Sequence, residues 1–80
     1  MKKQVKKFEI LSLRRGNNSY YGNPSWYLGL ADNKGDIYYA KTASNASIGY
    51  SVDSSWVGKV KKLEYHFTTT GNMIVDCLVK

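Results

Sequence analysis

Short stretches of alternating apolar residues, separated by turns rich in glycine and asparagine, limit what this chain can fold into more than any other feature. Trp26, Leu28 and Leu30, for example, recur at every second position, which is the period of a strand with one buried face. Residues 44–52 break this alternation and offer one apolar pair at helical spacing, Ile48 with Val52. The pattern therefore predicts a mainly β protein with one short helix.

Five strands are expected from the alternation and from the turn residues between the stretches. They cover residues 6–15, 26–30, 36–42, 57–70 and 73–79. In the first of them, Phe8 and Ile10 share one face while Leu11 and Leu13 share the other, which indicates a bulge partway along the strand.

The order of these elements is three strands, a short helix and two strands. It matches the oligonucleotide/oligosaccharide-binding (OB) fold, a five-stranded Greek-key barrel, which we expect here as an antiparallel barrel. An SH3-like barrel is the alternative, although its short helix usually precedes the last strand. A chain of 80 residues has room for one small core, so we expect residues 1–80 to form a single domain.

Residues on the apolar side of each predicted strand should form the core. They are Ile10, Leu13, Trp26, Leu28, Leu30, Leu63, Phe67 and Val75. In the third strand, one of the adjacent Tyr38 and Tyr39 must point outward, and we favour Ile37 and Tyr38 sharing the core role through a bulge. Cys77 lies in the β-like stretch 73–79 and is expected to be a small buried residue.

The sequence lacks the residues that common reaction chemistries need. Its one cysteine and one histidine, His66, cannot supply a structural zinc shell, and no nucleotide-binding or nucleophile-elbow motif occurs. Asp32, Asp36 and Asp53 lie in or beside turns, where aspartate is common. We therefore expect no enzyme activity, no metal and no cofactor, with His66 facing solvent.

Positive charge and tyrosine are in excess. The formal net charge is +6, and six of the eleven aromatic residues fall between positions 20 and 39. Flat rings beside cations suit stacking on unpaired bases, with the cations on phosphates. Gly29, beside Tyr27, should leave an open shelf on the exposed face. The candidate binding residues are Tyr20, Tyr21, Tyr27, Tyr38, Tyr39, Lys41, Arg14, Arg15, Lys59, Lys61 and Lys62.

These features favour a non-enzymatic binding module for nucleic acid, single-stranded by preference. Two alternatives stay open: a phage-type protein-interaction module or inhibitor that binds an acidic host protein, and an oligomeric structural or assembly protein.

The longest apolar runs are too short to cross a membrane, and the basic N-terminus lacks the apolar segment of a signal peptide. With its lone Cys77, we expect a cytoplasmic protein without a membrane partner.

Three short motifs carry a resemblance to known proteins. They are Asn23-Pro24-Ser25-Trp26-Tyr27-Leu28, Lys41-Thr42-Ala43-Ser44-Asn45-Ala46 and Gly49-Tyr50. Together they resemble small uncharacterised OB-like β-barrel proteins of phages and bacterial mobile elements, over roughly residues 17–75. The resemblance implies a phage-like origin, and with it a host cytoplasm, but it implies no particular activity and assigns no functional residue.

Overall fold

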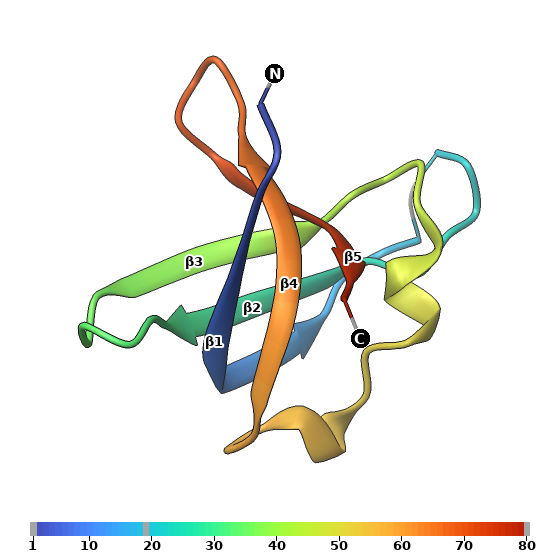
Figure 1. Cartoon of the computed structure of the whole chain (residues 1–80). Coiled ribbons are helices and arrows are strands. Elements are labelled where there is room, and N and C mark those ends of the chain that lie inside the picture. The colour runs from blue at the N-terminus through green and yellow to red at the C-terminus, as the bar shows by residue number, and fades with distance from the viewer. Residues whose placement is uncertain (1, 19, 80) are drawn as a thin grey trace.

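The computed structural model describes residues 2–18 and 20–79. Five strands and two 3-10 helices make up the regular structure (Figure 1). They are β1 (Gln4–Arg15), β2 (Trp26–Ala31), β3 (Ile37–Thr42), η1 (Ser47–Tyr50), η2 (Ser54–Trp56), β4 (Val60–Phe67) and β5 (Met73–Leu78). The helix expected in residues 44–52 is thus a 3-10 turn, and η2 follows it, so that β4 is shorter than predicted.

The strands form a closed barrel in the order β1-β2-β3-β5-β4. Every neighbouring pair is antiparallel except β3 and β5, which run parallel from the pair Ala40–Met73 to the pair Thr42–Val75. A closed ring with an odd number of strands cannot alternate direction all the way round, so the expectation of a wholly antiparallel barrel was wrong at this pair.

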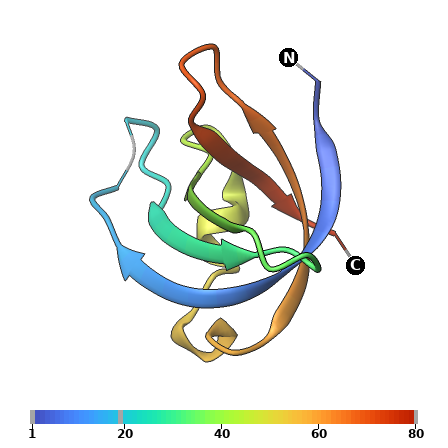
Figure 2. The ribbon, with the colours of Figure 1, turned by 90° about the vertical axis from the view of Figure 1, so that its left-hand side faces the viewer.

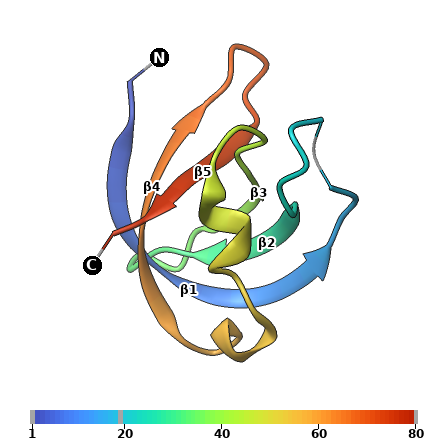
Figure 3. The same cartoon turned by 90° about the vertical axis from the view of Figure 1, so that its right-hand side faces the viewer.

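The position of the helical segment distinguishes the OB-like barrel from the SH3-like alternative. Both 3-10 helices lie between β3 and β4, and η1 lies across the barrel beside β5 (Figure 3). This crossover carries the chain from β3 to β4, and the two strands are not neighbours. The last strand, β5, then lies between them and closes the barrel. The result is the OB-like strand order.

One long strand serves both sides of the barrel. β1 pairs with β4 through its first half and with β2 through its second half, and it curves strongly between them (Figure 2). The register with β2 shifts between Ile10 and Ser12, which leaves Leu11 as the extra residue. The predicted bulge is confirmed, and it allows Ile10 to be buried while Leu13 also packs against the core.

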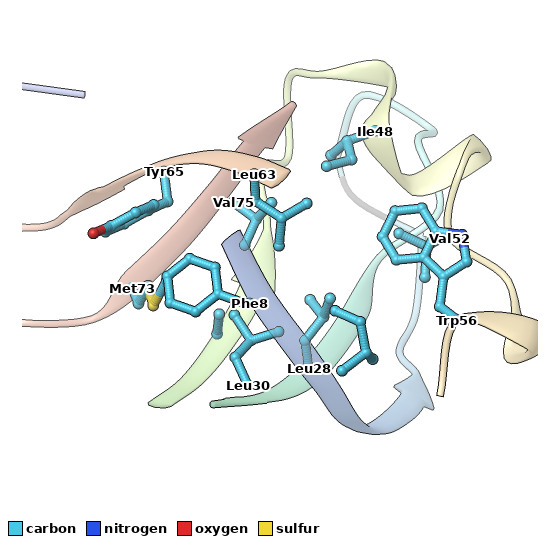
Figure 4. Packing of buried hydrophobic residues seen from close by; sticks show 12 residues of the cluster. Phe8, Leu28, Leu30, Ile48, Val52, Trp56, Leu63, Tyr65, Met73 and Val75 are labelled. Atoms are coloured by element: carbon cyan, nitrogen blue, oxygen red, sulfur yellow. The ribbon is translucent and has the colours of Figure 1, made fainter. Parts of the chain in front are cut away.

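The core fills the barrel and extends beneath the crossover (Figure 4). Its buried members are Phe8, Ile10, Leu28, Leu30, Ala40, Ile48, Val52, Trp56, Leu63, Tyr65, Met73 and Val75. Of the predicted core, five residues are fully buried, while Leu13 and Trp26 are partly buried against them. Phe67 was wrongly predicted: it is 39% exposed at the last position of β4.

A second bulge reverses the expected orientation of Cys77. Glu64 pairs with Cys77 and the next residue, Tyr65, pairs with Val75, so Asp76 is the extra residue. The bulge shifts the alternation by one position, which turns Cys77 to the surface and lets Leu78 pack against the core. The prediction of a buried cysteine was wrong for this reason.

Regular alternation settles the two adjacent tyrosines of β3. The β2–β3 register has no shift, so the expected bulge is absent, Tyr38 packs against the core and Tyr39 is 81% exposed. Ile37 is exposed as well, contrary to expectation.

Among the described residues, no helix has the length and apolar character to span a bilayer.

Candidate nucleic-acid interface

Two rows of residues cross the outer face of the barrel, because the register places them directly opposite one another on neighbouring strands. Arg14 of β1 pairs with Tyr27 of β2, which pairs with Lys41 of β3, which pairs with Ile74 of β5. The shorter row comprises Ser12, Gly29 and Tyr39. Sheet register therefore gathers onto one face residues as far apart in sequence as Ser12 and Ile74.

The two rows line an open groove with a volume of about 860 Å³. Its other walls are Leu13, Leu28, Ala40, Asn72 and Met73. Asn72 comes from the turn between β4 and β5. We call this surface the β1–β2–β3 groove.

Tyr39 is the most exposed ring of the groove. With 81% of its surface free, it can present a face to a planar ligand. Tyr38 points the other way and packs against the core, with its hydroxyl 3.4 Å from a carboxylate oxygen of Asp32. Burial is the largest cause that raises the pKa of the Tyr38 phenol, followed by the charge of Asp32.

Tyr27 is held in place by its neighbours. The Arg14 guanidinium carbon lies 4.9 Å from the ring centroid and the Lys41 ammonium nitrogen 5.8 Å from it, both within cation–π range. The ring also lies against Gly16, where a Cβ would come within 2.8 Å of the ring. Tyr27 is 40% exposed. Because its ring contacts Gly16 on one side and the two cations on others, it holds Arg14 and Lys41 beside the groove.

Gly29 does not form the open shelf that the sequence suggested. It is buried, and a Cβ placed on it would lie 2.5 Å from the Ser12 hydroxyl oxygen. Ser12 thus covers the space that the missing side chain leaves, and its hydroxyl is among the polar groups of the groove.

Arg15 faces away from the groove and supports the loop between β1 and β2. Its guanidinium donates to the carbonyls of Gly16 and Ser25 at 3.0 and 3.3 Å and to the Asn18 side chain at 2.8 Å. It also lies 5.8 Å from the centre of the Trp26 ring. Both terminal guanidinium nitrogens of Arg15 are thus engaged within the fold, whereas the Arg14 side chain has no hydrogen bond among the described residues.

Tyr20 and Tyr21 project from that loop. Both rings are exposed and contact each other edge to face at a centroid distance of 5.5 Å. Tyr21 borders a second hollow beside the groove, whereas Tyr20 borders neither hollow.

The second basic cluster predicted from the sequence lies elsewhere on the barrel. Lys61 and Lys62 pair with Phe8 and Lys7 in the first half of β1, and the Lys61 ammonium lies 5.1 Å from the Trp56 ring. Lys59 precedes β4, and its carbonyl accepts from the Ile10 amide. None of the three lines the groove.

The second hollow contains a polar pair that sequence reasoning missed. The His66 Nδ1 and an Asp76 carboxylate oxygen are 2.7 Å apart, and these side chains are only 20% and 10% exposed. His66 therefore does not simply face solvent. The β4–β5 hairpin could have predicted this pair. Counting back from the turn at residues 68–72 places His66 opposite Ile74, and Asp76 lies two positions further along the same strand.

Cys77 and His66 have separate carboxylate partners. The Cys77 thiol donates to Glu64 at 3.6 Å, and desolvation, followed by the charge of Glu64, raises the pKa of this thiol. Within residues 2–18 and 20–79, no three histidine, cysteine or acidic side chains gather as a metal ion would need.

The fold and the groove define a class: a small five-stranded β-barrel with OB-like strand order and an aromatic, basic face. Comparison of the chain with protein-family models, curated proteins and solved structures gives no match. The resemblance to phage and mobile-element barrels therefore stays a prediction.

Proposed function

We propose that this protein is a non-enzymatic module that binds single-stranded nucleic acid in the β1–β2–β3 groove. The observation that carries the proposal is the free ring of Tyr39 in a groove that also contains Arg14 and Lys41. This face, with the loops that flank it, is the surface that OB-fold proteins commonly use for oligonucleotides.

Each part of the groove has a distinct physical role in the proposal. The Tyr39 ring stacks on an unpaired base, a contact that tolerates any sequence because every base has a π-face. Arg14 and Lys41, fixed beside Tyr27, neutralise backbone phosphates and release counterions. A base inside a duplex has both faces covered by its neighbours, so this arrangement favours single strands.

A titration of labelled oligonucleotides tests the proposal directly. Single-stranded and duplex DNA and RNA should be compared by fluorescence anisotropy at about 50 and about 200 mM salt. We expect the single strands to bind more tightly than the duplexes, with affinity falling as salt rises. The proposal fails if the wild-type protein binds none of these nucleic acids at the lower salt concentration.

Matched variants separate stacking from charge. Tyr39→Ala should weaken binding by about 1–3 kcal/mol, whereas Tyr39→Phe keeps the ring and should bind like wild type. Lys41→Ala should reduce the salt slope by up to about one unit. Lys62→Ala removes an equal charge outside the groove and should change the slope less.

A protein partner is the second candidate, favoured by three tyrosines outside the groove. Tyr20, Tyr21 and Tyr50 are all exposed, and the Tyr50 hydroxyl lies 3.4 Å from the Gly22 carbonyl, which places Tyr50 beside that loop. Tyrosine is enriched at the energetic centres of protein interfaces, and a net charge of +6 suits an acidic partner. Loss of partner binding in Tyr20→Ala and Tyr50→Ala, with Tyr39→Ala unaffected, would support this candidate.

We propose a cytoplasmic setting for either activity, in the host cytoplasm if a phage encodes the chain. Cys77 carries a free and exposed thiol, which suits a compartment that keeps thiols reduced.

A further inference from the structure

The β1–β2–β3 groove continues into the second hollow. Lys41 and Ile74 line both, and along β3 the outward side chains Tyr39 and Lys41 are about 7 Å apart. The second hollow is also lined by Lys3, Tyr21, residues 42–45, His66 and Asp76. A strand stacked on Tyr39 can therefore pass over Lys41 and place a neighbouring base against the His66–Asp76 pair.

The hydrogen bond between His66 and Asp76 fixes what the pair presents to a ligand. A carboxylate only accepts hydrogen bonds, so the His66 Nδ1–H donates to Asp76 at 2.7 Å. In the neutral ring this leaves Nε2 as an acceptor. Among the described residues, nothing donates to the other Asp76 oxygen or bonds Nε2.

Two acceptors without partners therefore belong to a side-chain pair that lines the hollow. The Asp76 side chain is only 10% exposed. Its hydrogen bond with His66 Nδ1 holds the carboxylate in place. The cation of Lys3 lies at the rim, with its nitrogen 3.9 Å from a Glu64 oxygen. The hollow thus combines fixed acceptors for a base with cations for the adjoining phosphates.

We infer that the second hollow is a base-selective subsite that prefers bases with an exocyclic amine over uracil and thymine. This inference rests on the proposed function. The amine of cytosine donates a hydrogen bond to a carboxylate oxygen, a known Asp and Glu contact. This amine has two N–H donors for the two acceptors of the pair, whereas uracil and thymine carry a carbonyl oxygen at the same position and offer only their single N3–H.

The experiment compares oligodeoxycytidine and oligodeoxyuridine of about twelve nucleotides in anisotropy titrations at neutral pH and one salt concentration. The wild type should bind the cytidine oligomer about three- to tenfold more tightly, the factor that one net hydrogen bond provides. Cytidine oligomers whose exocyclic amine carries two methyl groups lack the donor hydrogens, and they should lose that preference with the protein unchanged.

Asp76→Asn gives the result a sign. The asparagine oxygen can still accept from His66, while its amide group offers a donor where the carboxylate oxygen was. The ratio of cytidine to uridine affinity should therefore fall to about one or below. Glu64→Gln is the matched control, because it removes one negative charge from the same sheet but lines neither hollow. It should raise both affinities and leave their ratio unchanged.

The outcomes separate this inference from the proposed function. If oligomers bind but the wild-type ratio is near one, or if both the methylated oligomer and Asp76→Asn keep the wild-type ratio, the subsite is overturned while the proposed function stands. If the wild type binds no oligomer, both are overturned. A misfolded Asp76→Asn protein, recognised by circular dichroism, leaves the methylated oligomer to decide.

Discussion

The indole N–H of Trp26, at the start of β2, donates a hydrogen bond to the backbone carbonyl of Gly49 in η1 at 3.1 Å. Gly49 also lies against the Pro24 carbonyl, so closely that a Cβ at Gly49 would overlap its oxygen. These contacts fasten the crossover segment to the strand that anchors the groove. Glycine is needed at this position, because any side chain would collide with the Pro24 carbonyl.

Gly49→Ala should therefore destabilise the protein by about 1–3 kcal/mol through overpacking. Backbone atoms of Pro24 block the methyl group, and they cannot rotate away as a side chain can. Urea unfolding measures the change. Ser47→Ala, at an exposed position of the same 3-10 helix, is the control and should stay within about 0.5 kcal/mol of wild type. Equal stability of the two variants would contradict the close packing.

Leu28→Ala should cost about 2–5 kcal/mol, because it leaves a cavity in a fully buried part of the barrel. Leu11→Ala removes the same atoms from the bulge of β1, where the side chain is exposed, and it should cost much less. Thermal and chemical unfolding of the two variants test the face assignment of both strands. A larger loss of unfolding free energy for Leu11→Ala than for Leu28→Ala would contradict this face assignment.

The carboxylate of Asp32 should make stability depend on pH. It is buried and accepts hydrogen bonds from the Lys34 and Asp36 amides at 2.9 and 3.0 Å. Desolvation alone raises the pKa of Asp32, but the hydrogen bonds from Asp36 and Lys34 and the charge of Lys6 together lower it below the ordinary value of 3.8.

A lowered pKa in the folded state means that folding favours the ionised form. The resulting stabilisation is fully present above the pKa of the unfolded chain and is lost as pH falls through the lower folded value. Asp32→Asn keeps an acceptor without the charge, so its deficit in free energy of unfolding should be largest near neutral pH and shrink below about pH 4. Urea titrations across this range measure it. A deficit that stays constant with pH would rule out the ionic contribution.

Cys77 should react with a thiol reagent in the folded protein, because it is exposed. Desolvation and the neighbouring Glu64 raise the pKa of its thiol, and the thiolate is the reactive form. Glu64→Gln should therefore increase the reaction rate at mildly alkaline pH. In urea the difference between the two proteins should disappear, since the pairing across β4 and β5 is lost. A slower Glu64→Gln protein would mean that the carboxylate does not oppose ionisation.

Local patterns were enough to predict much of the fold. The alternation of Leu28 with Leu30, the turns around Gly35 and Gly71, and the conflicting faces of Ile10 and Leu11 are each encoded within a few residues. Both of these glycines adopt the positive φ that their turns require. Consequently the five strands, the β1 bulge and the outward Tyr27 could be predicted before any tertiary contact was known.

Other features depended on how the strands meet. The bulge at Asp76 arises only when β5 pairs with β4, and it alone decides that Cys77 faces outward and Leu78 inward. Likewise, Gly29 and Ser12 meet only because β1 pairs with β2 in this register, so local patterns could not show that the shelf would be covered.

The sequence by itself determined the strands, their turns and the excess of tyrosine and positive charge, because these follow from local periodicity and composition. Only the tertiary structure decided which of these residues act together. Closure of a five-stranded ring required a parallel pair, which here is β3–β5, and that pair sets Lys41 beside Ile74. Register then grouped Arg14, Tyr27 and Lys41 on one face and sent Lys61 and Lys62 to another, since pairing between distant strands depends on the whole barrel.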